Sequence, residues 1–463
     1  MSLHDYKSRA KIYVIPEFRV SRPCFSSDGN AMNYRFLETG EKLILNFPSI
    51  ITSDGTPWNI ANSYLLNLSL QAPPISISLK GIRGVADDLL NYLRFLEDQG
   101  LDLFYLPSNE RLRVTYRYRN HIQDLVLAGA IKRSTGKQRI NRVVRFYKGL
   151  LSQGLVLSEE LKNLPYEVLS KTITSLDSKG FVRKTTVHTH NLKLSGVRDG
   201  RDFEAIVDEG ALRPLPREDQ RVFLRALKAT GNRAMQLIFY LALFTGARIQ
   251  TCCTIRIKNL DGKLDSSNNY RMRIGAGTGI DNKNSKNMML IIPGWLVQDL
   301  KLYSVSNKAR AAQEKSELGI SKENYLFLTN RGKPYYTSKL EISQYIERDA
   351  EIDKSRKTEI SINEGTTIRV FLAKVHCNIS KEYPGFYQYR FHDFRATFGM
   401  NLLEMLLNNP LHNTNSALIV LQQRMGHQDL ETTMRYLSYR NNINIGLEVQ
   451  DSYESQLLDL IQS

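Results

Sequence analysis

The sequence has few cysteines and no long apolar run. Its four cysteines, Cys24, Cys252, Cys253 and Cys377, show no CxxC spacing, so we predict neither a disulfide framework nor a structural metal site. No run of about 18 apolar residues could cross a bilayer. The first residues also lack the charged and apolar regions of a secretory signal. We therefore expect a cytoplasmic protein without a membrane partner.

Acidic residues are scarce relative to basic ones. The 463 residues include 47 Asp and Glu against 63 Lys and Arg, a formal net charge of +16. Such an excess favours a polyanionic partner, because each neutralised phosphate releases condensed counterions. Charge alone fits DNA, RNA or an anionic membrane. The length predicts two or three domains.

The first half of the chain shows three patterns. Residues 1–75 combine short β-like runs with Pro, Ser and Asn, and we interpret them as an N-terminal extension, an arm or an accessory domain. Over 79–175, apolar residues recur at helical spacing, which predicts a compact helical domain. Residues 176–211 have few periodic apolar positions and are predicted to be a linker.

The predicted helical domain contains a basic stretch, residues 132–148, without any acidic residue. A solvated basic helix face is the alternative to a DNA contact here. Beside the C-terminal pattern described below, we favour DNA contact. The side chains expected to make it are Lys132, Arg133, Lys137, Arg139, Arg142 and Arg145.

A second domain is predicted to open near residue 212, where Pro and acidic residues suit a first helical turn. Residues 235–244 are almost wholly apolar and predict a buried helix, which ends just before Arg248. An arginine at the edge of a core needs an anion, either a structural carboxylate or a phosphate.

Three strands are predicted after Arg248, at 255–262 together with a turn, at 271–274 and at 288–293. The turn between the last two contains Lys283 and Lys286.

The C-terminal part contains His392-Asp393-Phe394-Arg395, then Gly426-His427, and Tyr436 nine positions later. A tyrosine can attack phosphorus, an arginine can stabilise charge on the non-bridging oxygens, and histidines can position or move protons. The order of these residue types indicates phosphodiester chemistry.

With these motifs in order, the chain resembles the tyrosine recombinases, also called the phage integrase family. Residues 241–249 resemble the family's first box, residues 391–398 the second and residues 424–436 the third. The resemblance spans roughly residues 79–440 and is most specific at these boxes.

The resemblance implies a mainly α fold with a small antiparallel β-sheet, in the α+β class. A helical core DNA-binding domain over 79–175 and a catalytic domain over 212–440 would clamp DNA from opposite sides. The stretch 300–390 is longer than the family needs and is predicted to hold an insertion. Residues 441–463 are predicted to form a tail helix.

The family's roles can be assigned residue by residue. Tyr436 would be the nucleophile that forms a 3′-phosphotyrosyl bond, while Arg248 and Arg395 would clamp the phosphate. The remaining candidates are His392 at the tyrosine, His427 on the phosphate, and Lys283 or, alternatively, Lys286 at the leaving oxygen. Neither a metal nor another cofactor is chemically required.

The implied partner is double-stranded DNA at specific recombination sites, bound by a homotetramer near the nucleoid. Accessory DNA-bending or directionality proteins are further candidate partners. The alternative functions are relaxation of DNA by a type IB topoisomerase and regulation by a DNA-binding protein without catalysis. One departure from the family stands out, because Thr251 occupies the place where an acidic residue usually orients the first arginine.

Overall fold

The computed structural model describes residues 6–28, 31–71, 79–156, 161, 163–176, 182–195, 205–283, 286–351 and 361–462. The chain divides into two compact units, Met1–Gly200 and Arg201–Ser463. Most described elements are helices, and the named strands pair two by two in antiparallel ladders. The predicted fold class is therefore confirmed. Among the described residues, no helix is both long and apolar enough to cross a membrane.

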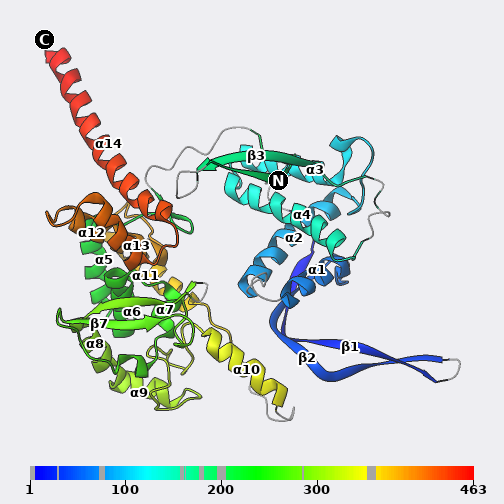
Figure 1. Cartoon of the computed structure of the whole chain (residues 1–463), viewed down its shortest axis with the longest axis horizontal. Helices are drawn as coiled ribbons and strands as arrows, with labels where there is room; N and C mark the ends of the chain where they lie inside the picture. The colour runs from blue at the N-terminus through cyan, green and yellow to red at the C-terminus, as the bar shows by residue number, and fades with distance from the viewer. Residues whose placement is uncertain are drawn as a thin grey trace. The chain divides into compact units, whose positions relative to one another are not determined.

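The first unit combines a helical bundle with two long hairpins (Figure 1). Its elements are β1 (Lys11–Asp28), β2 (Ala31–Ile51), α1 (Asn59–Leu70), α2 (Leu79–Gln99), η1 (Glu110–Leu112), α3 (Val114–Leu127), α4 (Arg133–Ser152), β3 (Val168–Leu176) and β4 (Val182–His190).

One hydrophobic core connects the predicted N-terminal extension to the predicted helical domain. Phe47 of β2 and Tyr64 of α1 belong to the same buried cluster as Leu89 of α2 and Phe146 of α4. The Tyr64 and Phe146 rings meet edge to face, with centroids 5.2 Å apart. Because burial of such side chains is the main stabilising term of a fold, residues 43–70 are part of the first unit rather than a separate arm.

Part of the predicted linker forms strands. β4 pairs with β3 from Val168↔His190 to Leu176↔Val182, and Leu192 belongs to the first unit's core. Later residues of the same stretch form strands of the second unit. The remaining parts of the predicted linker, 177–181 and 196–204, lie outside the described residues.

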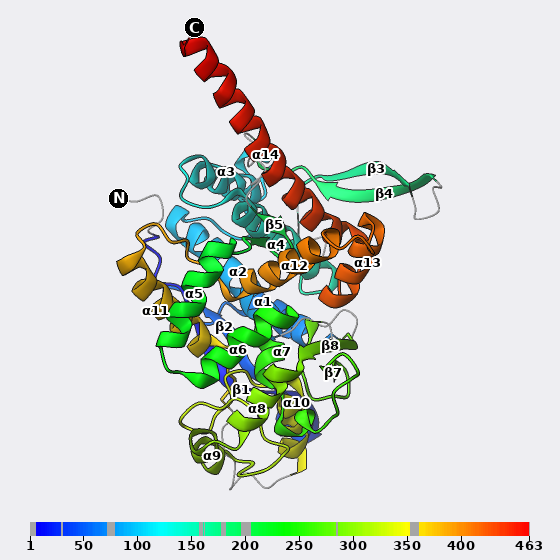
Figure 2. The same cartoon turned by 90° about the vertical axis from the view of Figure 1, so that its left-hand side faces the viewer.

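The second unit consists mainly of helices, with two short antiparallel hairpins among its described residues (Figures 1 and 2). Its elements are β5 (Ile206–Val207), β6 (Ala211–Leu212), α5 (Arg217–Ala229), α6 (Arg233–Thr245), α7 (Ile249–Thr254), η3 (Ile257–Leu260), β7 (Asn269–Ile274), β8 (Met288–Pro293), α8 (Gly294–Ser304), α9 (Asn307–Glu314), α10 (Lys339–Glu351), α11 (Thr366–Glu382), α12 (Phe391–Leu407), α13 (Thr414–Met425) and α14 (Leu430–Gln462).

The core of the second unit forms around α6. This helix begins at the Asn232 cap, whose side chain accepts from the Met235 amide at 3.3 Å, so an otherwise unpaired amide of the first turn is satisfied. Nine of its 13 residues are buried, as the apolar run at 235–244 predicts, although Phe244 at the end of that run is exposed. Phe239 of α6 packs edge to face on Phe394 of α12, with ring centroids 5.1 Å apart.

Two of the three strands predicted after Arg248 are confirmed as β7 and β8, but the prediction at 255–262 is wrong. Ile257–Leu260 is a 3₁₀ turn, and only a single bridge, Arg256↔Tyr325, forms at this place. Ile255 is fully buried although it belongs to no strand. A β-branched residue can therefore be selected here by packing in the core rather than by pairing in a sheet.

The stretch predicted as an insertion, 300–390, contains α9, α10 and α11. Ile368, Leu372, Val375 and Ile379 of α11 lie in the unit's main core, so this helix is integral to the domain. Residues 352–360 of the stretch lie outside the described residues.

The predicted tail helix is continuous with the helix before it. α14 runs from Leu430 to Gln462 without a break, and its C-terminal half extends away from α12 and α13 (Figures 1 and 2). In that half Leu458 and Ile461 are exposed. The boundary predicted at residue 441 therefore lies inside one helix.

Candidate active site

Two helix ends deliver the first arginine and the second histidine to one place. α6 ends at Gly246 and α13 at Gly426, both in the left-handed conformation with φ of 69° and 66°. Glycine adopts this conformation without the steric cost that a Cβ brings. The backbone turns after each glycine, so that Arg248 lies two residues beyond Gly246 and His427 lies one residue beyond Gly426.

Arg395 joins these two helix ends. It lies on α12, is 3 % exposed, and donates from Nη1 to the Gly246 carbonyl at 2.8 Å and from Nη2 to the Met425 carbonyl at 2.5 Å. Burial, together with the neighbouring charge of Arg248, lowers the pKa of Arg395. Its Nε atom lies 3.7 Å from the Asp208 carboxylate. Arg395 thus links the ends of α6 and α13 by hydrogen bonds and is also a candidate phosphate ligand.

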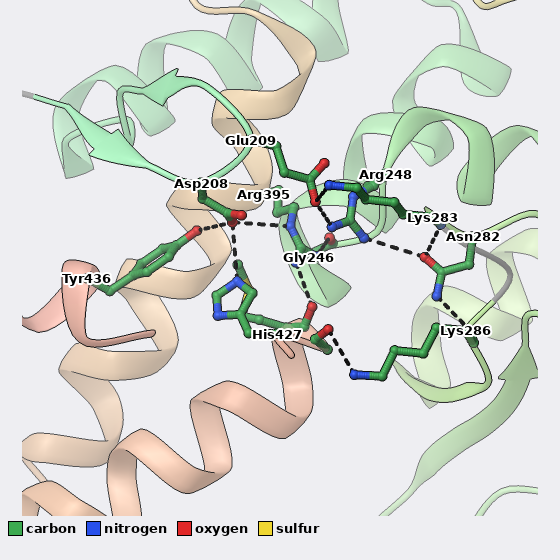
Figure 3. Close-up of polar contacts among 12 residues, drawn as sticks. Asp208, Glu209, Gly246, Arg248, Asn282, Lys283, Lys286, Arg395, His427 and Tyr436 are labelled. Atoms are coloured by element: carbon green, nitrogen blue, oxygen red, sulfur yellow. Dashed lines mark hydrogen bonds and ion pairs between the residues drawn. The ribbon is translucent and has the colours of Figure 1, made fainter. Parts of the chain in front are cut away.

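Two carboxylates that the sequence analysis missed occupy the centre of the site (Figure 3). Asp208 and Glu209 form the tip of the β5–β6 hairpin. Asp208 is 3 % exposed and its Oδ2 accepts from the Tyr436 hydroxyl at 3.0 Å. The same oxygen lies 3.2 Å from Nε2 of His427.

Burial would raise the pKa of Asp208, but hydrogen bonding from His427 and the charge of Arg395 outweigh it and hold the pKa well below its usual range. Asp208 is therefore an anion in this site.

Glu209 is the partner of the first arginine. Its Oε1 accepts from Nη2 of Arg248 and lies 3.0 Å from Nζ of Lys283. Although burial opposes it, the hydrogen bond and charge of Arg248 lower the pKa of Glu209. Arg248 thus meets a carboxylate, one of the two anions that its position predicts.

Thr251 does not orient Arg248, because its hydroxyl donates to the Asp281 carbonyl at 2.8 Å. Asn282 contributes instead. Its Oδ1 accepts from Nη1 of Arg248 at 3.4 Å and from the Lys283 amide at 2.8 Å. The place of the family's usual acid is therefore taken by contacts from other segments.

Tyr436 is fully buried on α14. Burial, reinforced by the negative charge of Asp208, raises the pKa of Tyr436 well above its ordinary value. The hydroxyl therefore keeps its proton in this state and donates a hydrogen bond to Asp208. Its ring packs against Gly399 of α12, where an added Cβ would lie 2.6 Å from Cε1.

The two histidines have different environments. His427 is held from both ring nitrogens, with Nδ1 at 3.0 Å from the Thr433 hydroxyl and Nε2 on Asp208. His392 has a buried Nε2 without a hydrogen-bond partner among the described residues. Burial, then the charge of Arg395, lowers the pKa of His392 to about 4, so this imidazole is neutral near pH 7.

Both candidate lysines line the same open pocket as Arg248 and His427. Nζ of Lys283 contacts Glu209, while Nζ of Lys286 donates to the Gly426 carbonyl at 3.4 Å. The catalytic candidates other than His392 thus fall into two adjacent groups of polar contacts, one around Asp208 and one around Glu209 and Asn282 (Figure 3). His392 lies one helical turn before Arg395 on α12.

The basic residues predicted to contact DNA lie on or next to α4 of the first unit. Lys132, Lys137 and Arg145 are exposed. Arg133 instead donates to the Leu194 carbonyl at 2.8 Å, and Arg142 lies 3.6 Å from Asp88. Three of the six side chains are thus presented to solvent, whereas two of the others also hold the unit together. The described residues contain no cluster of three or more potential metal ligands.

Asp208 and Glu209 escaped the sequence analysis because they lie in the stretch predicted to be a linker. The available signal was weak: an Asp-Glu-Gly turn between apolar residues, shortly before a domain predicted to need an anion for Arg248.

A sequence model described as the phage integrase family matches residues 217–442. Among solved structures, the integrase of transposon Tn1549 bound to circular intermediate DNA is 14 % identical, with a TM-score of 0.43, covering 81 % of this chain and 94 % of that one. A variant of that integrase bound to the transposon's right end is 13 % identical, with a TM-score of 0.42 and the same coverage. No curated protein sequence matches the chain.

Proposed function

This chain belongs to the phage integrase family, the tyrosine recombinases, and on that premise we propose that Tyr436 cuts and rejoins DNA at specific sites, so that a mobile element is integrated or excised. The observation that carries the proposal is the convergence of Tyr436, His427, Arg395 and Arg248 on the two carboxylates of one turn. Cationic and hydrogen-bonding groups that converge on carboxylate oxygens also suit the oxygens of a phosphate.

The proposed reaction is a phosphoryl exchange. The Tyr436 oxygen attacks phosphorus, a 3′-phosphotyrosyl bond forms, and the bond to the 5′ oxygen breaks. A 5′-hydroxyl from a second strand then attacks the phosphotyrosyl bond and releases the tyrosine. One phosphodiester is exchanged for another, so the bond energy is kept in the covalent intermediate and no ATP is needed.

Arg248 and Arg395 stabilise the charge on the non-bridging oxygens. Their planar guanidinium groups match the geometry of phosphate oxygens. By analogy with other oxyanion donors, each arginine lowers the activation barrier by about 3 kcal/mol, which raises the rate by on the order of 10². His427, already a hydrogen-bonding group in this site, binds a phosphate oxygen.

Two proton transfers complete the reaction. We assign acceptance of the Tyr436 proton to His392, which lies one helical turn before Arg395 on α12 and is neutral near pH 7. We assign protonation of the 5′ oxygen to Lys283, because its amine already shares an anion with Arg248. Lys286 is the alternative, since it reaches the same pocket.

We further propose double-stranded DNA as the partner, held by the exposed basic residues of α4, and a homotetramer on two DNA sites at the nucleoid of the cytoplasm. The exposed apolar residues near the end of α14 support a subunit contact there. DNA-bending or directionality proteins are compatible with this assembly.

The decisive experiment captures covalent protein–DNA adducts from a library of nicked genomic fragments and maps the attached strand ends. We expect adducts at a small set of sites, each linked to Tyr436, and none with Tyr436→Phe. An adduct that persists in this variant would refute the assignment of the nucleophile. Relaxation of plasmids without a special site, and without recombinants, would instead support a type IB topoisomerase.

A further inference from the structure

The acidic turn separates the nucleophile from the open part of the site. The pocket open to solvent is lined by Arg248, His427 and both lysines, together with Asp208 and Glu209. Tyr436 is fully buried and Arg395 is 3 % exposed. Neither of these two residues lines the pocket, and both contact Asp208, which does (Figure 3). A phosphate that enters the pocket therefore meets the turn before it meets Tyr436.

The two carboxylates use the same groups that a DNA phosphate would need. Glu209 holds Arg248 and Lys283, while Asp208 holds His427 and the hydroxyl of Tyr436. An anionic phosphate cannot share these groups with two anions at hydrogen-bonding distance, because like charges in a partly buried site repel strongly. Occupation by the turn and occupation by a phosphate are thus mutually exclusive.

The turn is a short element between fixed ends. Ile206 and Leu212 pair with each other and are buried on either side of it. Beyond Leu212 the chain is tied to α12, where the Arg213 amide donates to Asp393 at 3.1 Å. A rearrangement can therefore be confined to the residues at the tip.

Backbone conformation at the tip favours such a rearrangement. Glu209 has φ of 58° and the following Gly210 has φ of 141°. A glutamate rarely adopts a positive φ, which persists where surrounding contacts hold it. Here the contacts with Arg248 and Lys283 do so, and the strain is released once a phosphate takes those two partners.

Resting on the proposed function, we infer that the Asp208–Glu209 turn is an internal mimic of the DNA phosphate that keeps the site closed until DNA displaces it. In the free enzyme the Tyr436 hydroxyl is then mainly hydrogen-bonded to Asp208. Part of the binding free energy of a cleavable phosphate is used to displace the turn. The apparent affinity is therefore the intrinsic affinity multiplied by the fraction of molecules whose site is open.

The test compares wild-type full-length protein with Asp208→Asn and Glu209→Gln, which keep the shape of each side chain and remove its charge. The probe is a nicked duplex carrying a sequence recovered from the adduct library. We expect each variant to form the Tyr436 adduct about tenfold faster at subsaturating DNA. Glu323→Gln is the matched control, since it removes one carboxylate from an exposed ion pair with Lys258 outside the pocket, and it should leave the rate unchanged.

Hydrogen exchange gives a second measurement that does not need cleavage. The amides of residues 206–212 should exchange faster when a short duplex of mixed sequence is added to wild-type protein. In Asp208→Asn they should already exchange faster without DNA.

The outcomes distinguish this inference from the proposed function. If wild-type protein forms no adduct with any duplex, the proposed function fails, and the exchange measurement alone decides the inference. If wild-type protein forms adducts but both variants are equally fast or slower, the turn is not an inhibitor, and a slower Asp208→Asn would make Asp208 a positioning residue for Tyr436. Unchanged exchange on saturation with DNA would also overturn the inference.

Discussion

Replacing Arg395 by alanine should lower the stability of the second unit more than replacing Arg248 by alanine, although both arginines are assigned to the same phosphate. Arg395 is buried and is the donor to two carbonyls, those of Gly246 and Met425. Each buried acceptor that loses its donor costs about 1–3 kcal/mol. The expected loss of unfolding free energy is therefore about 4 kcal/mol for Arg395→Ala.

Arg248→Ala leaves a less severe defect. Its side chain and that of Glu209 are 15 % and 28 % exposed, and Glu209 keeps Lys283 as a partner. We expect a loss of about 1 kcal/mol, because Glu209 keeps one cationic partner and part of its contact with solvent. Both variants should nevertheless lose cleavage by on the order of 10² or more.

Thermal unfolding of the full-length variants measures this difference. For a unit of this size, about 1 kcal/mol corresponds to a shift of about 2–4 °C, so Arg395→Ala should melt about 10 °C lower than Arg248→Ala. Arg395→Lys should fall between wild type and Arg395→Ala, because one amine cannot replace a planar fork that reaches two carbonyls. Equal melting temperatures for the two alanine variants would refute the structural role of Arg395.

Three further predictions concern the neighbours of the nucleophile. Gly399→Ala should lower the rate of adduct formation by on the order of tenfold or more, because its Cβ would displace the Tyr436 ring; a normal rate would show that the packing is looser than described. His392 has a pKa of about 4 in the folded chain against 6.5 as its ordinary value, so the unfolded chain takes up its proton first and stability falls as pH drops from 6.5 to 4, by up to about 3 kcal/mol. In urea unfolding between pH 7 and 5, His392→Gln should lack this component, and an unchanged pH dependence would contradict the assignment. Lys283→Ala should lose cleavage of an ordinary duplex and regain it on a duplex with a 5′-phosphorothiolate leaving group, which needs no proton. Lys286→Ala should cleave the ordinary duplex without such rescue, and the reverse pattern would exchange the roles of the two lysines.

The order of the candidate residues along the chain could be read from the sequence because each box is a local pattern. A buried apolar helix that ends in Gly246 places Arg248, and the step from Gly426-His427 to Tyr436 covers one turn and the start of one helix. Helix periodicity and a glycine at a helix end are encoded within a few residues. The two strands of the lysine hairpin were predictable for the same reason.

What the sequence could not determine depends on contacts between distant segments. Asp208 meets Tyr436 across 228 positions, and Glu209 meets Arg248 across 39. No periodicity or motif links such pairs, because only the packing of the β5–β6 hairpin on α12 and α14 brings them together. The same holds for the two carbonyls that Arg395 binds. The sequence by itself therefore determined which chemical groups this protein has and in what order, while the tertiary structure alone decided that two carboxylates stand where a phosphate is expected to bind.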